Sequence, residues 1–306
     1  MNPLDRMLVF VRVAELSSFT QAAEALGIPK AGASVAVQHL EGQLGTRLLH
    51  RTTRRVQLTQ DGQAYYERCK DLLADVDELQ SMFQQQGGDA LRGRVRIDMS
   101  TGVARRVVLP QLPGLLERHP RLEIEISSTD RRVDLVREGF DCVVRVGTVA
   151  EPGLVARPLG QLRMVNCASP DYLARLGTPQ SLQDLEHHHL IHYVTTLGAK
   201  SSGFEHLHDG KVLRQPMAGP ITVNGAEAYQ AACLAGLGIV QAPLIGLHGH
   251  LERGTLVSVL PGHPAPPMPI TLLYAHRRHL PRRVRVVMDW MAQVIEDHVA
   301  RIDAFA

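Results

Sequence analysis

Basic and hydroxyl side chains cluster between residues 47 and 55, where they form the chain's clearest candidate for binding chemistry. Guanidinium groups and hydroxyls are the groups that proteins use to hold phosphate oxygens. The whole chain carries a formal charge of only +2, so a generic polyanion binder is not expected. A local basic stripe instead favours a polyanion that touches one face of the molecule. The cluster consists of Arg47, Arg51, Thr52, Thr53, Arg54 and Arg55.

The residues before this cluster predict three helices. Apolar residues from Leu4 to Ala14 recur at helical spacing and predict the first helix. Ser17 and Ser18 interrupt it and supply caps for a second helix from about Thr20 to Leu26. Gly27 ends that helix, and a third begins at Pro29 and runs to about Leu44, where Gly45 closes it. The third helix is expected to bury Ala33, Val37, Leu40 and Leu44.

The order of these elements is typical of a helix-turn-helix. Two helices joined by a tight glycine turn form this motif, and its second helix enters the major groove of DNA. Two extended stretches within residues 48–59 flank the basic turn, as in a wing that lies against the phosphate backbone. The pattern alone does not exclude an unrelated three-helix bundle with a solvated arginine face.

Specific residues make this region resemble the LysR family of transcription regulators. The matching strings are Ser18-Phe19-Thr20-x-Ala22-Ala23-x-x-Leu26-Gly27, Ser34-x-x-x-Gln38-x-Leu40-Glu41-x-x-Leu44-Gly45-x-x-Leu48-Leu49-x-Arg51-Thr52-Thr53-Arg54 and Leu58-Thr59-x-x-Gly62. The resemblance implies binding to double-stranded DNA. Pro29, Gly32 and Val35 depart from residues common in the family, so the target sequence cannot be carried over. The expected DNA-binding residues are Ser18, Thr20, Gln21, Lys30, Ala31, Ser34, Gln38, Arg51, Thr52, Thr53 and Arg54.

A long helix is predicted between Gln63 and Gln86, a stretch without proline or glycine. Its apolar residues follow a heptad spacing, which favours a partner helix, although a helix lying on its own domain is the alternative. The resemblance implies a homodimer or homotetramer formed here, with a hinge at Gly87-Gly88. The seam consists of Tyr65, Cys69, Leu72, Val76, Leu79 and Phe83.

After the hinge, strands alternate with helices and predict an α/β region with parallel sheets. Strands are expected at 94–99, 122–126, 141–146, 221–223, 236–240 and 270–274, and helices at 107–118, 131–138, 226–234 and 283–299. Arg145-x-Gly147, Ala168-Ser169-Pro170 and Ala235-Gly236-x-Gly238 also resemble the LysR family. The resemblance implies a two-lobed effector domain like that of type 2 periplasmic binding proteins.

The predicted fold is therefore multidomain, with mainly helical and α/β parts. Residues 1–60 form an all-α winged helix-turn-helix, and residues 61–88 form a linker and dimerisation helix. Residues 92–306 form the effector-binding domain, in which lobe I comprises 92–161 and 268–306 and lobe II comprises 162–267.

A small-molecule effector is expected in the cleft between the lobes, at the carboxyl ends of strands. Ser100 and Thr101 end a strand and open a helix, so they either hold a ligand carboxylate or cap the helix. Arg145 either meets an anion or forms an internal ion pair. Carboxylates and aromatic acids are the first effectors to consider. The candidate contacts are Ser100, Thr101, Gly102, Thr129, Arg145, His192, Asn224 and Gly225.

Other chemistries are less well supported by the sequence. His187-His188-His189 lacks the spacing of a zinc site and is expected to form a polar turn. The four cysteines are expected to be buried thiols, with a Cys142–Cys167 redox pair as the minor alternative. Gly236-Leu237-Gly238 is interpreted as a tight turn and not as a cofactor site. We therefore expect no cofactor, no metal and no enzyme.

Two other classes of function remain as alternatives, a solute-binding transport component and a small-molecule enzyme that uses the cleft. The first needs an export signal, and the charged N-terminus lacks one. The second needs a catalytic constellation, and none stands out. The expected location is the cytoplasm, on the nucleoid and off the membrane, with RNA polymerase as a further candidate partner.

Overall fold

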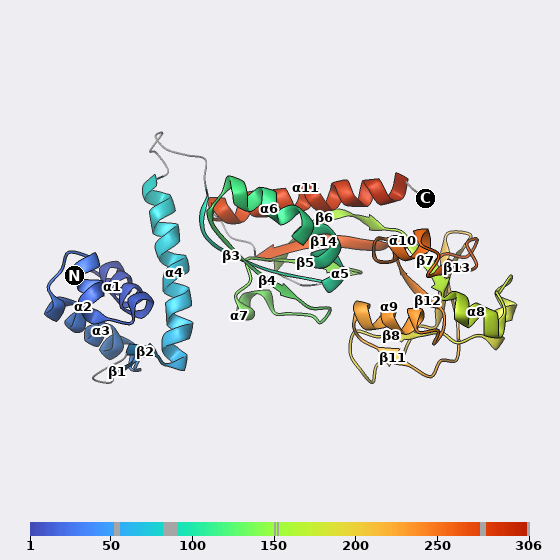
Figure 1. Ribbon diagram of the computed structural model, residues 1–306, viewed down its shortest axis with the longest axis horizontal. Coiled ribbons are helices and arrows are strands. Elements are labelled where there is room, and N and C mark those ends of the chain that lie inside the picture. The colour runs from blue at the N-terminus through green and yellow to red at the C-terminus, as the bar shows by residue number, and fades with distance from the viewer. Residues whose placement is uncertain (52–55, 82–90, 150, 152, 276–279, 305–306) are drawn as a thin grey trace. The chain divides into compact units, whose positions relative to one another are not determined.

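A computed structural model describes residues 1–306 except 52–55, 82–90, 150, 152, 276–279 and 305–306. The chain divides into two compact units, unit 1 with residues 1–94 and unit 2 with residues 95–306 (Figure 1). No helix in the described part of the chain is long and apolar enough to cross a membrane.

Unit 1 begins with three helices, α1 (Pro3–Leu16), α2 (Phe19–Ala25) and α3 (Lys30–Leu44). Asn2 and Asp5 form a capping box at the start of α1, and the Ser18 side chain caps α2. Gly45 adopts a left-handed conformation at the end of α3, with φ of 69°. The three helices predicted from the sequence are confirmed, because apolar spacing and capping residues agree on their bounds.

A short antiparallel hairpin follows α3. Strand β1 (Leu49–Arg51) pairs with β2 (Val56–Leu58), which confirms the two extended stretches. The basic turn between them lies outside the described residues. Leu48 and Leu49 return to the core of unit 1 and fill it beside Val37 and Leu40. The expected burial of Leu44 is wrong: its side chain is 43% exposed, since the chain turns away at Gly45 and residues 48 and 49 occupy the core instead.

Helix α4 (Gln60–Ser81) follows the hairpin in unit 1. Along the predicted heptad seam, Cys69 is buried in the unit's own core and Tyr65 packs against it. Farther along, Leu72 and Leu79 are 42% and 62% exposed. The first part of the seam therefore fits the alternative interpretation, a helix lying on its own domain. Its last member, Phe83, lies outside the described residues.

Unit 2 contains a five-stranded sheet in the order β4-β3-β5-β14-β6. We call the part built on this sheet lobe I. Its strands are β3 (Arg92–Met99), β4 (Arg121–Ser128), β5 (Cys142–Val146), β6 (Leu154–Leu162) and β14 (Met268–Ala275). Strands β3 and β5 are parallel, as predicted, but β14 runs antiparallel to both β5 and β6. The expectation of an all-parallel sheet is wrong, because β14 enters from the other lobe in the opposite direction.

Helices cover the sheet of lobe I. A continuous helical segment consists of α5 (Thr101–Val103), a π-helical turn at Ala104–Val108 and α6 (Leu109–Arg118). The C-terminal helix α11 (Arg282–Ala304) contacts β6 and the π-helical turn. The predicted helix at 131–138 is shorter than expected: α7 spans only Leu135–Glu138, because the Asp134 side chain caps it there.

Lobe II is built on a second sheet in the order β12-β7-β13, formed by β12 (Val240–Pro243), β7 (Met164–Ala168) and β13 (Val257–Ser258). All three strands pair antiparallel, which again differs from the predicted parallel sheet. A parallel pair, β8 (His192–Tyr193) with β11 (Thr222–Val223), and a hairpin of β9 (Phe204–His208) and β10 (Lys211–Gln215) complete its strands. Its helices are α8 (Pro170–Leu176), a 3-10 turn at Gln183–His187, α9 (Ala226–Leu234) and α10 (Leu244–Glu252).

The histidine triplet begins at the last residue of the 3-10 turn of lobe II, His187. His188 is only 4% exposed, and its Nδ1 lies 3.1 Å from the Tyr172 hydroxyl. The expected polar turn is therefore wrong for His188, although His187 and His189 are exposed. All four cysteines are buried free thiols, as predicted. Gly236 has φ of 74°, which fits the predicted tight turn.

Candidate functional site

One face of α3 is exposed and polar. Lys30, Ala31 and Gln38 are exposed, Ser34 is half-buried between them, and Val35 is 61% exposed. These positions recur every three or four residues, so they share one side of the helix. The opposite side is buried in the core of unit 1 through Ala33, Ala36, Val37 and Leu40. A helix held on one side and open along the other is able to enter a DNA groove.

Helix α2 positions the remaining predicted groove-side residues. Gln21 is exposed, whereas Ser18 and Thr20 are half-buried. The Ser18 hydroxyl accepts a hydrogen bond from the Gln21 backbone N–H at 3.3 Å, so this side chain serves first as a helix cap. The turn into α3 uses Gly27 in the left-handed region, with φ of 64°.

The wing residues are only partly described. Arg51 ends strand β1, and Thr52, Thr53 and Arg54 lie outside the described residues. The base of the hairpin is fixed by Glu41 of α3, whose carboxylate accepts hydrogen bonds from the Leu48 and Leu49 backbone N–H groups at 2.9 and 3.2 Å. This contact joins the hairpin to the exposed helix α3.

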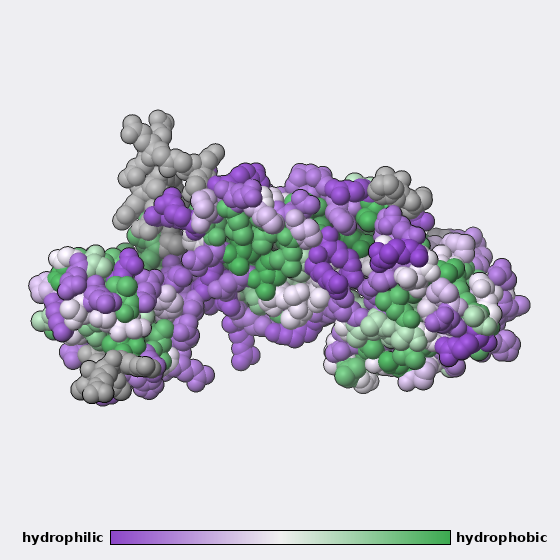
Figure 2. All heavy atoms as spheres, in the orientation of Figure 1, coloured by the Kyte–Doolittle hydropathy of each residue, from purple (hydrophilic) through white to green (hydrophobic). Residues whose placement is uncertain are grey.

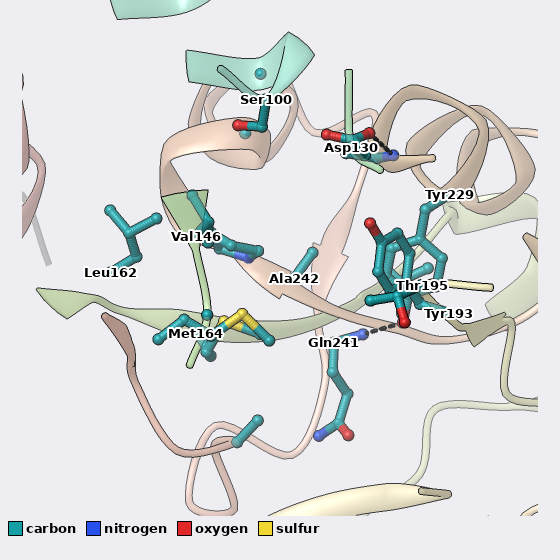
Figure 3. A pocket seen from close by; sticks show the side chains of 18 of the residues that line it. Ser100, Asp130, Val146, Leu162, Met164, Tyr193, Thr195, Tyr229, Gln241 and Ala242 are labelled. Carbon is teal, nitrogen blue, oxygen red and sulfur yellow. Dashed lines mark hydrogen bonds between the residues drawn. The ribbon is translucent and has the colours of Figure 1, made fainter. Parts of the chain in front are cut away.

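A cavity of about 680 Å³ lies between the two lobes of unit 2. In Figure 2 the surface of unit 2 narrows between the lobes, and hydrophilic side chains gather there. Ser100, Asp130 and Val146 line the cavity from lobe I, and Tyr193 and Tyr229 line it from lobe II (Figure 3). The volume suits a small molecule.

Half of the predicted effector contacts line this cavity. Ser100, Gly102, Thr129 and Arg145 belong to its wall. Ser100 precedes α5 but makes no capping hydrogen bond with its side chain.

The other four predicted contacts, Thr101, His192, Asn224 and Gly225, are not among the residues that line the cavity. His192 Nδ1 lies 2.9 Å from the Ser201 hydroxyl. Gly225 is the N-cap residue of α9.

Arg145 forms the internal ion pair that the sequence left open. Its guanidinium lies 2.5 Å from Asp98 Oδ1, and Asp98 is fully buried. The Thr129 hydroxyl donates to the other Asp98 oxygen at 3.2 Å. Two predicted ligand contacts are thus held by one buried carboxylate.

Several polar residues at the cleft were missed from the sequence. Arg106 of lobe I reaches Glu227 at 3.2 Å and the Gln230 side-chain oxygen at 2.5 Å, both in lobe II. Asp130 follows the end of β4 and accepts from the Ala226 N–H at 2.7 Å. The arginine contacts span about 120 positions, so no local pattern could reveal them. Asp130 adjoins the predicted Thr129, and its place after a strand end was the available signal.

Two tyrosines form the aromatic wall of the cavity. The rings of Tyr193 and Tyr229 meet edge to face, with centroids 5.5 Å apart. The Tyr229 hydroxyl accepts from the Gln241 backbone N–H at 3.0 Å (Figure 3). Burial, with a smaller contribution from the charge of Asp130, raises the pKa of Tyr193 to about 12. Tyr193 therefore offers a neutral hydroxyl to the cavity at any physiological pH.

Comparisons with known proteins agree with this two-part design. Residues 4–63 match the model for the bacterial regulatory helix-turn-helix proteins of the LysR family. Residues 88–296 match the LysR substrate-binding domain. The chain belongs to the LysR family. It is therefore a DNA-binding transcription regulator with an effector-binding domain.

Individual relatives cover nearly the whole chain. It is 46% identical over 299 residues to YhjC, an uncharacterized HTH-type transcriptional regulator of Escherichia coli K12, covering 98% of this chain and 100% of that protein. An HTH-type transcriptional repressor of Pseudomonas aeruginosa is 36% identical and covers 97% of this chain and 94% of its own length. Among solved structures, the LysR-type regulator CrgA of Neisseria meningitidis is 27% identical with a TM-score of 0.60, covering 96% of this chain and 99% of that one.

Proposed function

We propose that this LysR-type regulator binds a roughly palindromic promoter site as a dimer, and that a small molecule in the interlobe cleft controls this binding. The observation that supports the reading of DNA is the exposed face of α3, set against a fully apolar buried face. Ser34 and Gln38 on that face would contact base edges, while Arg51, Thr52, Thr53 and Arg54 would hold phosphates.

The regulatory part of the proposal rests on the cleft. Its lining comes from both lobes, so a bound molecule interacts with each of them at once. A ligand shifts a conformational equilibrium only through its different affinity for the two states. A molecule that bridges the lobes would stabilise an arrangement in which the two lobes lie closer together. In this way it would change how the DNA-binding units of the dimer are presented to DNA. RNA polymerase is the candidate partner through which that change would affect transcription.

The alternative classes are weaker. A transport component would not need a chain segment that matches a DNA-binding family over residues 4–63. For an enzyme, charged groups at the cleft are engaged within the protein, as Arg145 is with Asp98 and Asp130 is with the Ala226 N–H. We accordingly propose a non-catalytic regulator that works in the cytoplasm, where its DNA is.

Fluorescence anisotropy with a library of randomised DNA sites tests the assignment of DNA contacts. Gln38→Ala should change the order of preferred sequences, because an amide pairs with a base edge. Arg54→Ala should weaken all sequences alike and reduce the salt slope by about 1. Gln293→Ala, at an exposed position of α11, is the matched control and should leave both properties unchanged. If the α3 and wing variants behave identically across the library, the assignment is wrong.

A thermal-shift screen of small molecules tests the cleft. Stabilisation should grow with ligand concentration as RT ln(1 + [L]/Kd). Ser100→Ala, at the lobe I wall, should reduce the shift. A shift that Ser100→Ala leaves untouched would place the effector elsewhere.

A further inference from the structure

Asp130 joins the two lobes at the edge of the cleft. It follows β4 in lobe I, and its Oδ2 accepts a hydrogen bond from the Ala226 N–H, the first residue of α9 in lobe II, at 2.7 Å (Figure 3). The N-cap residue of α9 is Gly225, which has no side chain to cap the helix. The carboxylate of one lobe therefore caps a helix of the other.

This contact occupies the place where an anion would bind lobe II. The first N–H groups of a helix have no partner within the helix, and the helix dipole adds positive charge there. A ligand carboxylate would gain most from the same N–H groups. In this structure the chain's own carboxylate already accepts from one of them, the Ala226 N–H.

The arginines of the cleft also have partners within the chain. Arg106 pairs with Glu227 at 3.2 Å, a carboxylate that it shares with the more exposed Arg105, and Arg145 pairs with Asp98 at 2.5 Å. Arg214 pairs with Glu205 at 2.9 Å. Each of these guanidiniums already has a carboxylate partner within the protein, so an incoming anion would have to displace it.

Among the described residues of the cavity wall there is one further arginine, Arg132. Arg132 lies at an exposed position, where water and salt screen its charge. Most of the deeper wall is apolar or aromatic, with Leu162 and Met164 on one side and Tyr193 and Tyr229 on the other (Figure 3). Such a wall favours an apolar body with hydroxyl or amide groups.

We propose that Asp130 is a specificity-determining residue that excludes carboxylates from the α9 end of the cleft, so that the effector is an uncharged, partly apolar molecule. This inference rests on the proposed effector cleft and names the class of its ligand. It replaces the carboxylate expected from the sequence, because the Ala226 N–H of α9 and the guanidiniums of Arg106, Arg145 and Arg214 already have carboxylate partners within the chain.

Removal of the Asp130 side chain should create the anion site that it now fills. In Asp130→Gly, acetate should raise the melting temperature by about 2 °C or more relative to chloride at equal ionic strength. Acetate should not do so in the wild type, where the position is taken, and acetamide should not do so in either protein. Asp134→Gly is the matched control, because Asp134 caps α7 by accepting from the Arg137 N–H at 3.0 Å but does not line the cleft.

Asp130→Asn provides a second variant should the glycine variant fold poorly. Its amide oxygen is able to keep the bond to Ala226 without the charge, so acetate should have no more effect on it than on the wild type. The proposal is overturned if acetate stabilises the wild type as much as Asp130→Gly. It is equally overturned if Asp130→Gly folds but shows no acetate-specific rise in melting temperature. If Asp130→Gly does not fold, the proposal is overturned when acetate stabilises the wild type or Asp130→Asn more than chloride does.

The effector class is tested directly on the wild-type protein. A library of matched aromatic and aliphatic acids and their primary amides is compared by thermal shift, and the amides should stabilise the protein more. If they stabilise it no more than the acids, the proposal fails. The DNA affinity of the wild type and of the Asp130 variants is also measured without ligand. If the effector class is wrong, DNA binding is still intact, whereas failure of the proposed function would appear as a loss of DNA binding.

Discussion

Gly62 shows how a single residue without a side chain permits the wing to lie against the linker helix. Its N–H donates to the Thr59 hydroxyl at 2.8 Å, and that hydroxyl donates to the Arg47 carbonyl at 2.7 Å. A Cβ at position 62 would overlap the Leu48 carbonyl oxygen, which is backbone and has little freedom to move. We expect Gly62→Ala to lower the free energy of unfolding of unit 1 by roughly 3 kcal/mol.

Chemical denaturation checks this expectation, with Gly42→Ala as the control. Gly42 lies within α3 and has nothing near the position of a new Cβ. Alanine there should stabilise the helix by about 0.5–1 kcal/mol. Equal effects of the two substitutions would show that the close approach to Leu48 is not what requires glycine at 62.

We expect His188 to make the stability of lobe II depend on pH. The Tyr172 hydroxyl accepts from the His189 N–H at 2.8 Å and lies 3.1 Å from His188 Nδ1. A neutral imidazole that carries its proton on Nε2 accepts at Nδ1 and fits this contact. Burial lowers the pKa of His188, with Asp184 acting in the opposite direction. Protonation of His188 at Nδ1 would place a second N–H donor against the Tyr172 hydroxyl, beside the His189 N–H.

The pH profile of unfolding should reflect this arrangement. Because the folded-state pKa of His188 is below the unfolded value of about 6.5, stability is full above that value and falls as the pH drops through it towards the folded pKa. His188→Gln keeps an acceptor for Tyr172 without titrating, so it should flatten this fall. Other histidines whose pKa is lowered by burial, such as His206 and His298, retain part of this fall. The exposed His187→Gln serves as control; a wild-type slope in His188→Gln would contradict the assignment.

At the scale of elements, α4 divides its apolar residues between two tasks. Tyr65 and Cys69 pack on the core of unit 1, whereas Leu72 and Leu79 are exposed. We infer that the exposed Leu72 and Leu79 belong to the dimer contact, and that Tyr65 and Cys69 belong to the fold. Leu79→Asp should raise the dissociation constant of the dimer at least tenfold, because it places a charge in an apolar contact.

Analytical ultracentrifugation measures the dissociation constant of the dimer. Thermal unfolding of Leu79→Asp shows whether a change in that constant comes from a loss of stability. Cys69→Ala should lower the melting temperature of unit 1 without a specific effect on self-association. If Leu79→Asp leaves the dimer unchanged, α4 does not carry the contact.

The sequence predicted the elements of unit 1 better than those of unit 2. Local signals decide the helix bounds: Ser18 caps α2 and Gly45 ends α3, as expected. In unit 2 the helix at 226–234 and the return of residues 268–275 to the first sheet were also predicted correctly. Strand direction was not, since the antiparallel entry of β14 depends on a path through the other lobe.

The residues of the cleft were predicted only in part, because some carry a local sequence signal and others depend on contacts between distant segments. Ser100, Thr129 and Arg145 stand at strand ends, which is a local signal, and they do line the cavity. The pairing of Arg106 with Glu227 and of Asp130 with Ala226 joins distant segments and leaves no spacing to detect. The burial of His188 was missed because its partner, Tyr172, lies on a different element, α8.

At the scale of the whole molecule, the proposed dimer fixes the geometry of the DNA that it reads. Two α3 helices related by a two-fold axis would enter the major groove on the same face of the duplex, so the half-sites must be separated by about 10–10.5 base pairs or a multiple. Insertion of about 5 base pairs between them turns one half-site to the opposite face and should reduce affinity to that of a single half-site. Insertion of about 10 base pairs restores the face and should recover part of the affinity.

Anisotropy measured on these three spacings distinguishes a dimer reader from two independent binding units. The dimer-deficient Leu79→Asp should bind all three spacings alike and weakly, because only one unit then engages at a time. Gln38→Ala should keep the dependence on spacing while its order of preferred sequences changes, since the substitution alters base contacts and not the dimer. A wild-type protein that binds all three spacings equally would mean that each unit binds DNA by itself, and the proposed link between cleft closure and DNA binding would then lose its mechanical route.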